Sequence, residues 1–356
     1  MKKKLIVMGA LMLGLEAAAT GAVGPVTNDV FVGGREGYIT YRIPALAVSQ
    51  RGTVLAFCEG RKTGIFDHGD IDLVLKRSTD QGRTWSPLQV IQGAGFQTWG
   101  NPAPVVDRET GRIWLAFTLD NVRVFVSWSD DDGASWAEPR EITGEVKPEG
   151  WGWYATGPGH AIELASGRLL VPCDHRDAGG MSSHVIYSDD HGRTWRLGGV
   201  AGPRTDECIA AETGDGRVYL SMRNMLGQKR RAYAESYDGG LTWSEVRIEE
   251  RLVDSTCQAS IIALDDGGSA PLLLFLNPAS PKRENISLRA SGDGGRTWSE
   301  PRTIFAGPSA YSDLAILPGP AVGALYENGG IWPYSKITFT RLDREWIDAL
   351  GLGSQN

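Results

Sequence analysis

The sequence predicts an all-β protein, a six-bladed β-propeller with four-stranded antiparallel blades. The main observation is an eight-residue motif, Ser-x-Asp-x-Gly-x-(Thr/Ser)-Trp, which we call the Asp box. Five copies occur: "STDQGRTW" from residue 78, "SDDDGASW" from 129, "SDDHGRTW" from 188, "SYDGGLTW" from 236 and "SGDGGRTW" from 291. Of the 356 residues, 41% are hydrophobic and 22% charged, which is typical of a globular protein with a large core.

The second observation is the regular spacing of the boxes. The first begins at residue 78 and the fifth at residue 291, a mean spacing of about 53 residues. At that spacing, residues 28–342 hold close to six units. Repeated β-rich units of this length are typical of propellers, in which each unit forms one blade.

The third observation is that each unit contains three apolar or β-branched runs bounded by Gly, Asp or Asn, which predicts three strands. We call them strands A, B and C in chain order, and a box follows strand C in the first five units. The expected strands are 43–49, 52–60 and 71–78; 101–107, 111–120 and 122–129; 159–165, 167–174 and 183–188; 208–214, 216–223 and 231–236; 259–266, 271–277 and 285–291; and 312–318, 321–327 and 336–342.

The Asp box has a structural interpretation. Ser and Asp side chains cap backbone groups in tight turns, Gly allows a positive φ, and a Trp anchors the turn by packing beneath it. A single active site does not need five copies of one motif. We therefore interpret the box aspartates as folding elements rather than catalytic groups.

The N-terminus has the pattern of a signal peptide, predicted over residues 1–22. Three lysines precede an apolar run from Leu5 to Leu15, which is too short to span a bilayer, and small residues follow. Cleavage would leave residues 23–356 as one catalytic domain, secreted or periplasmic. An uncleaved membrane anchor is the alternative, and no other segment is apolar enough to cross a membrane.

Charge and cysteine content limit the partners. A net charge of −7 without a long basic run argues against nucleic acid. The four cysteines, at 58, 173, 208 and 257, lack the spacing of a zinc site; they could form disulfides outside the cell, but their pairing is not predicted. We interpret "CDHRD" at 173–177 as a polar loop rather than a metal cluster. No metal or cofactor is expected. We expect the protein to be a monomer.

Unusual polar residues recur at the starts of strands A and around the B-to-C loops. These positions share one face of a propeller, opposite the boxes. They carry Arg42, Asp67, Glu207, Arg223, Arg283, Tyr311 and Glu327. A solvated rim of charges is one interpretation, but unpaired charge beside apolar strands is costly. Three converging guanidinium groups instead favour a site for a carboxylate or phosphate.

Four sequence features together resemble the bacterial exo-α-sialidases, also called neuraminidases. They are "YRIP" at 41–44, the Asp boxes, "DECIAAETGDGRVYLSMRN" at 206–224 and "AYSDLAILPGPAVGALYENG" at 310–329. The resemblance covers nearly all of the expected mature chain. It implies a sialidase-like propeller that acts on terminal α-linked sialic acids of glycoproteins, glycolipids and oligosaccharides.

The resemblance also implies roles for the polar residues. Arg42, Arg223 and Arg283 would hold the carboxylate of sialic acid, and Glu327 would orient Arg42. Tyr311 would be the nucleophile with Glu207 as its base.

Asp67 would be the general acid and base, although Asp70 and Asp72 stand in the same loop. Trp99, Trp153 or Tyr154 could wall the pocket for the N-acyl group, or these aromatic residues could belong to the core.

The chemistry of the substrate explains a tyrosine nucleophile. Sialic acid carries a carboxylate on its anomeric carbon, so an attacking carboxylate would meet like-charge repulsion. A neutral phenol avoids that repulsion, but its pKa of about 10 requires a nearby base. The resemblance therefore implies a retaining hydrolase with a tyrosyl-sialosyl intermediate. A trans-sialidase, transglycosylating or intramolecular, a non-catalytic sialoglycan-binding propeller and a scaffold propeller are the alternatives.

Overall fold

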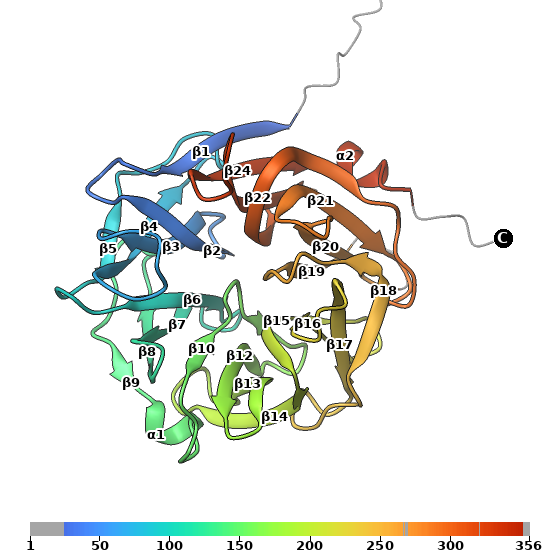
Figure 1. Cartoon of the computed structure of the whole chain (residues 1–356), viewed down its shortest axis with the longest axis horizontal. Helices are drawn as coiled ribbons and strands as arrows, with labels where there is room; N and C mark the ends of the chain where they lie inside the picture. The colour runs from blue at the N-terminus through green and yellow to red at the C-terminus, as the bar shows by residue number, and fades with distance from the viewer. Residues whose placement is uncertain (1–24, 266, 268–269, 320, 352–356) are drawn as a thin grey trace, which may run out of the picture.

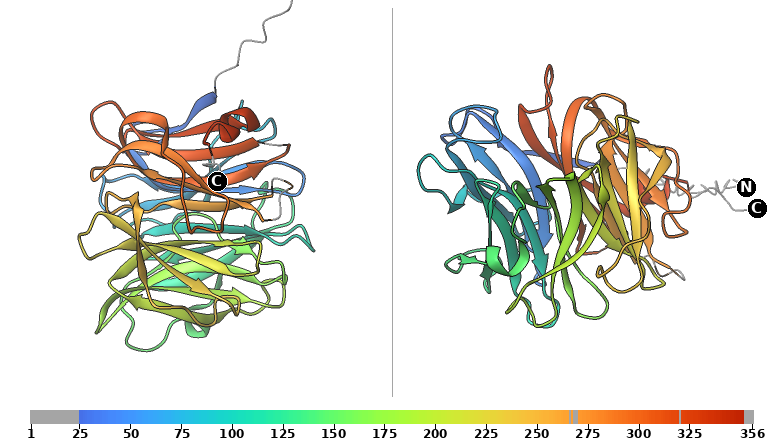
Figure 2. Two further views of the ribbon diagram at one scale, coloured as in Figure 1. Left: turned by 90° about the vertical axis from the view of Figure 1, so that its right-hand side faces the viewer. Right: turned by 60° about the horizontal axis from the view of Figure 1, so that its bottom comes forward.

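The computed structural model describes residues 25–265, 267, 270–319 and 321–351. Within this part of the chain, strands form five antiparallel sheets around a central axis (Figure 1). Seen from the side, the loops gather at the two ends of the molecule (Figure 2). The fold is all-β and propeller-like, as the sequence predicts.

Four sheets follow one another along the chain. The first sheet holds β2 (Thr40–Val48), β3 (Val54–Arg61), β4 (Ile71–Ser78) and β5 (Gln89–Gln92), and the second holds β6 (Trp99–Val106), β7 (Ile113–Leu119), β8 (Arg123–Ser129) and β9 (Arg140–Glu141). The third sheet holds β10 (Tyr154–Thr156), β11 (Ile162–Glu163), β12 (Leu169–Asp177), β13 (Gly180–Ser188) and β14 (Arg196–Pro203). The fourth sheet holds β15 (Thr205–Glu212), β16 (Val218–Asn224), β17 (Arg230–Ser236) and β18 (Arg247–Val253). Short helices α1 (Thr143–Val146) and α2 (Arg344–Asp348) lie at the periphery.

The fifth sheet has seven strands in the order β1-β24-β23-β22-β21-β20-β19. They are β1 (Val26–Val32), β19 (Ser260–Leu264), β20 (Leu272–Pro278), β21 (Glu284–Ser291), β22 (Arg302–Leu317), β23 (Ala321–Asn328) and β24 (Lys336–Asp343). Residues 302–308 of β22 pair with β21, and residues 309–317 pair with β23. The sheets therefore number five, and the count of six blades remains a prediction.

The N-terminal strand joins the two ends of the propeller-like ring. Val26 pairs with Arg341 and Val32 with Lys336, so β1 lies beside the last strand, β24. Phe31 of β1 and Phe339 of β24 lie in one core cluster with side chains of the first sheet. This closure buries apolar surface between the beginning and the end of the chain, which stabilises the ring.

The Asp boxes join neighbouring sheets, as the third box illustrates. Asp190 accepts hydrogen bonds from the backbone N–H and the hydroxyl of Thr194 at 2.9 and 2.7 Å. Gly192 has φ +80° and lies so close to Trp114 of the preceding sheet that a Cβ would clash. Trp195, the last residue of the box, packs edge-to-face on Trp114. Equivalent contacts across sheets pair Trp85 with Phe339, Trp136 with Phe57 and Trp298 with Tyr219.

A buried carboxylate on the axis links the sheets at their centre. Asp313 of β22 is fully buried and accepts hydrogen bonds from the N–H of Leu46 at 2.7 Å and the hydroxyl of Ser260 at 2.8 Å. His160 adds its N–H at 2.9 Å and lies with its ring Nδ1 2.7 Å from the carboxylate. Donors from the first sheet, the fifth sheet and the connection between β10 and β11 thus satisfy a buried polar group that would otherwise be costly.

Three further predictions concern the N-terminus, membrane-spanning segments and the cysteines. The predicted signal peptide, residues 1–22, lies outside the described residues. No helix of the described part is long and apolar enough to span a membrane. All four cysteines are buried and free, so the disulfides considered from the sequence do not form.

Candidate active site

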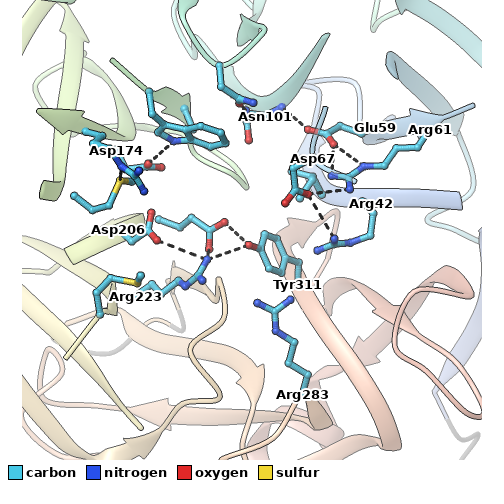
Figure 3. A pocket seen from close by; sticks show the side chains of 18 residues that line it. Arg42, Glu59, Arg61, Asp67, Asn101, Asp174, Asp206, Arg223, Arg283 and Tyr311 are labelled. Carbon is cyan, nitrogen blue, oxygen red and sulfur yellow. Dashed lines mark hydrogen bonds and ion pairs between the residues drawn. The ribbon is translucent and has the colours of Figure 1, made fainter. Parts of the chain in front are cut away.

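A cavity of about 340 Å³ opens at the end of the axis opposite the Asp boxes, and we call it the mouth cavity (Figure 3). The pairing of β3 with β4 defines this geometry, since Val54 faces Ser78, the start of a box, while Arg61 faces Ile71 at the other end. Charged side chains predominate among the residues that line it: Arg42, Ile43, Glu59, Arg61, Asp67, Asn101, Asn121, Trp153, Ala155, Asp174, Arg176, Met181, Asp206, Glu207, Arg223, Met225, Arg283 and Tyr311. The volume and the charges suit a small, polar, charged ligand.

Irregularities in the innermost strands place several of these side chains. The register shifts between Arg42 and Ala45 in β2, and between Gly100 and Ala103 in β6. Corresponding shifts span Asp206 and Glu207 in β15 and Ala310 and Tyr311 in β22. Bulges of this kind re-aim side chains next to active sites. They turn the residues at the starts of these strands toward the mouth cavity.

Arg42 is held by the buried carboxylate of Glu327. Its Nε donates to Glu327 Oε1 at 2.7 Å, and the N–H of Ile43 donates to the same oxygen at 2.9 Å. The other oxygen, Oε2, accepts from the N–H of Tyr311 at 3.1 Å. Ile43 itself has φ +62°, a costly conformation for a β-branched residue. Glu327 thus ties the start of β2 to the segment of β22 that carries Tyr311.

Tyr311, Glu207 and Arg223 form one contact group. The hydroxyl of Tyr311 donates to Glu207 Oε1, and Arg223 Nη1 lies 2.8 Å from Glu207 Oε2 and 3.3 Å from the tyrosine oxygen. Burial, and after it the charge of Glu207, raises the pKa of Tyr311 well above its usual range. The phenol is therefore neutral at rest, with an acceptor for its proton in direct contact.

Arg283 completes the group of three arginines. Its guanidinium carbon lies 5.4 Å from the centre of the Tyr311 ring, and that of Arg42 lies 5.1 Å from the same centre. Within the described residues no carboxylate lies within ion-pair distance of Arg283. Three guanidinium groups, two from strands β2 and β16 and one from the loop between β20 and β21, therefore meet beside the tyrosine, and that of Arg283 has no carboxylate partner among the described residues. This arrangement can bind a carboxylate.

The structure distinguishes among the three aspartates of the β3–β4 loop. Asp67 lines the mouth cavity, with its side chain 68% exposed, 2.9 Å from Arg61 Nη1 and 3.9 Å from Arg42 Nη1. Asp70 and Asp72 instead pair with Lys62, at 3.0 and 2.7 Å, and do not line the cavity. Only Asp67 of the three is placed to exchange a proton with a ligand in the cavity.

Sequence reasoning missed three carboxyl groups of the mouth cavity. Glu59 is buried against Arg61, with Oε2 2.6 Å from Nη2, and burial raises its pKa despite that arginine. Burial, then the charge of Asp206, raises the pKa of Asp174 as well. Asp206 has its pKa raised to about 6 by burial and then by the charge of Glu207. Glu59 and Asp174 end apolar strand B runs, the same signal that identified Glu327.

Of the three aromatic candidates, Trp153 alone lines the mouth cavity. Its indole N–H donates to Asp174 Oδ1 at 3.0 Å. Trp99 packs instead on Phe125 in the core between the first two sheets, and Tyr154 is fully buried. Consecutive strand residues point in opposite directions, so Tyr154 faces away from the side that Trp153 occupies. Trp99 and Tyr154 therefore lie in the core, the alternative that the sequence left open, and Trp153 remains the candidate for a pocket wall.

Across the described ranges, no cluster of three or more His, Cys, Asp or Glu side chains has a geometry that could hold a metal ion. The "CDHRD" segment lies in strand β12, so its interpretation as a polar loop is wrong. Cys173 is buried in the core and His175 stacks on Trp151.

Comparison with known proteins gives the family. The BNR repeat-like domain model matches residues 52–324. Sialidase-2 of Mus musculus is 32% identical over 86% of this chain and 92% of its own length. The chain belongs to the sialidase family. A "Sialidase" of Micromonospora viridifaciens is 36% identical over 91% of this chain.

Solved structures agree with this sialidase assignment. The "Hadza microbial sialidase Hz136" superposes with a TM-score of 0.83 at 30% identity, over 90% of this chain and 68% of that chain. A leech intramolecular trans-sialidase has the same fold, with a TM-score of 0.79 at 20% identity, over 91% of this chain and 71% of that chain. The chain spans 54% of the Micromonospora viridifaciens relative and 61% of a Bacteroides fragilis sialidase.

Proposed function

We propose that this protein is a retaining exo-α-sialidase, which hydrolyses terminal α-linked sialic acids of glycoproteins, glycolipids and oligosaccharides through a tyrosyl-sialosyl intermediate. The observation that carries the proposal is the contact of the Tyr311 hydroxyl with Glu207, beside three converging arginines. A carboxylate in contact with the hydroxyl can take its proton while the phenol oxygen reacts, and the arginines beside it can hold an anionic substrate. Family membership supports the same reaction class.

Substrate binding begins with the sialic acid carboxylate. Arg42, Arg223 and Arg283 supply charge-assisted hydrogen bonds to it, which are stronger than those between neutral groups. Arg283 has no carboxylate partner among the described side chains, so its charge is available to the ligand. This places the anomeric carbon, which bears the carboxylate, next to Tyr311.

The first chemical step forms the covalent intermediate. The Tyr311 oxygen attacks the anomeric carbon and its proton passes to Glu207, which is already in contact. The bond to the leaving oxygen breaks, and Asp67 donates a proton to that oxygen. Because the nucleophile is neutral until it reacts, it approaches the carboxylate-bearing carbon without charge repulsion.

The second step reverses these transfers. Asp67, now ionised, takes a proton from a water molecule, whose oxygen attacks the anomeric carbon. The bond to Tyr311 breaks, and the phenol oxygen recovers its proton from Glu207. Two displacements at one carbon leave the product with its original configuration. The chain's own residues move every proton in this sequence.

The proposal extends to the organisation of the protein. Counting the two halves of β22 as separate strands would divide the seven-stranded sheet into two, giving six blades. Residues 1–22 would direct export, leaving 23–356 as the secreted or periplasmic enzyme, which would act as a monomer.

Product analysis tests the proposed function. Proton NMR of reactions with α2,3- and α2,6-sialyllactose should show free sialic acid, formed first as the α-anomer. A first-formed β-anomer would contradict retention. A 2,7-anhydro product or transfer to a second glycan would replace the hydrolase with a trans-sialidase, the activity named for some solved structures of this fold. No product at all, with glycan binding retained, would indicate a binding propeller.

A further inference from the structure

Tyr334 contacts two of the three arginines of the mouth cavity. It lies in the turn between β23 and β24 and is half-buried. The guanidinium carbon of Arg42 stands 4.0 Å from the centre of its ring. Its hydroxyl accepts a hydrogen bond from Arg283 Nη1 at 2.7 Å. One side chain thus bridges Arg42 of strand β2 and Arg283 of the loop between β20 and β21.

The backbone and the neighbours of Tyr334 hold it in place. Its carbonyl oxygen accepts a hydrogen bond from the hydroxyl of Thr40 at 2.9 Å, which connects the turn to the start of β2. Its ring packs on the small core cluster that contains Cys257, Ala310 and Tyr311. Trp332 packs edge-to-face with the same ring, with ring centres 5.2 Å apart. The ring is therefore fixed relative to both the arginines and the tyrosine.

The chemistry of these contacts differs from that of an ion pair. A carboxylate partner neutralises a guanidinium and occupies N–H donors that a ligand needs. An aromatic face stabilises the cation through its quadrupole and occupies no N–H group. A phenol oxygen accepts one N–H bond and brings no negative charge. Arg42 gives only its Nε to Glu327, and Arg283 gives Nη2 to the carbonyl of Thr256, so other donors stay free.

We propose that Tyr334 is a positioning residue, which holds Arg42 and Arg283 at the separation that one carboxylate requires without neutralising either charge. The inference rests on the proposed function, because the ligand is the carboxylate of a sialic acid. Tyr334 acts through the two arginines and touches neither the anomeric carbon nor the leaving group.

Calorimetric titration of the whole protein with two probes tests this role. One is the unsaturated glycal analogue of sialic acid as its free acid, and the other is the methyl ester of the same glycal, which lacks the charge. Tyr334→Phe keeps the ring and removes the hydroxyl, and should raise the Kd of the acid about tenfold. Tyr334→Leu also removes the aromatic face, and should raise it about 100-fold. The Kd of the ester should change less than about twofold in either variant.

A matched control and a double-mutant cycle separate positioning from general stability. Tyr326→Phe removes a buried hydroxyl bonded to Thr340 on the same pair of strands, and should leave the Kd of the acid unchanged. In an Arg283→Ala background, Tyr334→Phe should add less than about twofold, because its partner is gone. Tyr334→Phe should unfold within a few degrees of the wild type, so a failure of Tyr334→Leu to fold leaves the test intact.

The outcomes are distinct. Wild-type protein that binds the acid, with Tyr334→Phe binding it equally well, would overturn the inference and leave the proposed function standing. An equal loss for acid and ester would also overturn it, since that indicates a general disturbance of the cavity. Wild-type protein that binds neither probe would overturn the proposed function, and the inference with it.

Discussion

The Asp boxes and the mouth cavity both carry aspartate and arginine side chains, but their charged groups find hydrogen-bond partners in opposite ways. Each box aspartate accepts bonds from its own turn, and hydrogen bonds from Thr84 lower the pKa of Asp80 to about 2. At the mouth, Asp206 has a pKa raised to about 6 by burial and by its neighbour Glu207, and Arg283 has no carboxylate partner among the described residues.

This difference shows how function can be recognised in a repeat protein. The side chains of each box form their hydrogen bonds within their own turn. The motif therefore recurs wherever the fold contains that turn and its contact with the preceding sheet. The mouth side chains come from different units and leave donors and charges unpaired. Unpaired donors and charges of this kind raise the free energy of the folded protein unless a ligand pairs with them.

The largest expected effect is on catalysis at the mouth. Tyr311→Phe should lower kcat on a sialyl-aryl substrate by about two to four orders of magnitude, because it removes the reacting oxygen and leaves the ring. Affinity for the glycal acid should persist, since the arginines remain. Turnover close to that of the wild type would remove Tyr311 from the proposed role.

The next effect concerns a box and should appear in stability alone. Trp195 is 2% exposed between two sheets, so Trp195→Ala should lower the free energy of unfolding by about 3–5 kcal/mol. Denaturant titration measures this loss. At temperatures where the variant is folded, its kcat/KM should match the wild type. A large loss of kcat/KM in folded protein would break the separation between box and mouth.

Arg283→Ala should chiefly weaken substrate binding. Loss of a charge-assisted hydrogen bond to the carboxylate should raise KM about 10- to 100-fold, with a smaller effect on kcat. Steady-state kinetics with sialyllactose provides the measurement, and Arg296→Ala, in the exposed fifth box, is the matched control. If KM and kcat both stayed at wild-type values, Arg283 would not belong to the carboxylate site.

The smallest effect, on pH dependence, sharpens the comparison because its sign reverses between the regions. The raised pKa of Asp206 means that folded protein binds this proton more tightly than the unfolded chain does. The resulting stabilisation is complete below about pH 4 and is lost as pH rises through about 6. Asp206→Asn should therefore gain in Tm, relative to the wild type, between pH 4 and pH 7.

The lowered pKa of Asp80 has the opposite consequence. Its stabilisation is present above about pH 4 and is lost as pH falls through about 2. Asp80→Asn should lose more Tm at pH 7 than at pH 3, as thermal unfolding at the two pH values would show. Parallel trends in the two variants would mean that the regions do not differ electrostatically as described.

Much of this arrangement follows from local sequence patterns. Strands A, B and C are apolar runs with clear ends, and antiparallel pairing alone predicts that Arg42, Glu207 and Tyr311 share one face. The blades are predicted to have four strands, but the positions of the fourth strands do not follow from the sequence because such strands can be short and partly exposed, as in β5 and β9. The pairing of β1 with β24 joins residues more than 300 positions apart, and no local pattern encodes it.

The site features that were not predicted also divide into those with a local sequence signal and those without one. Glu59 and Asp174 end apolar runs, and Tyr334 lies in a B-to-C loop, so the criteria used for Glu327 and Arg283 could have found them. The burial of Trp99 depends on which way a side chain points at a strand end. The register shift in β2 that aims Arg42 depends on contacts between distant segments, which composition and periodicity do not show.

The central claim is that Tyr311 forms a covalent bond with the sugar, and mass spectrometry after trapping tests it most directly. Incubation with 2,3-difluoro sialic acid, which loses its C2 fluoride when the enzyme attacks and whose C3 fluorine slows hydrolysis of the intermediate, should add one fluorosialosyl group to the protein. After digestion, the added mass should lie on the peptide that contains Tyr311 and should be absent in Tyr311→Phe. An adduct on Glu207 or Asp67, or turnover of the reagent with the product anomer inverted, would contradict the account.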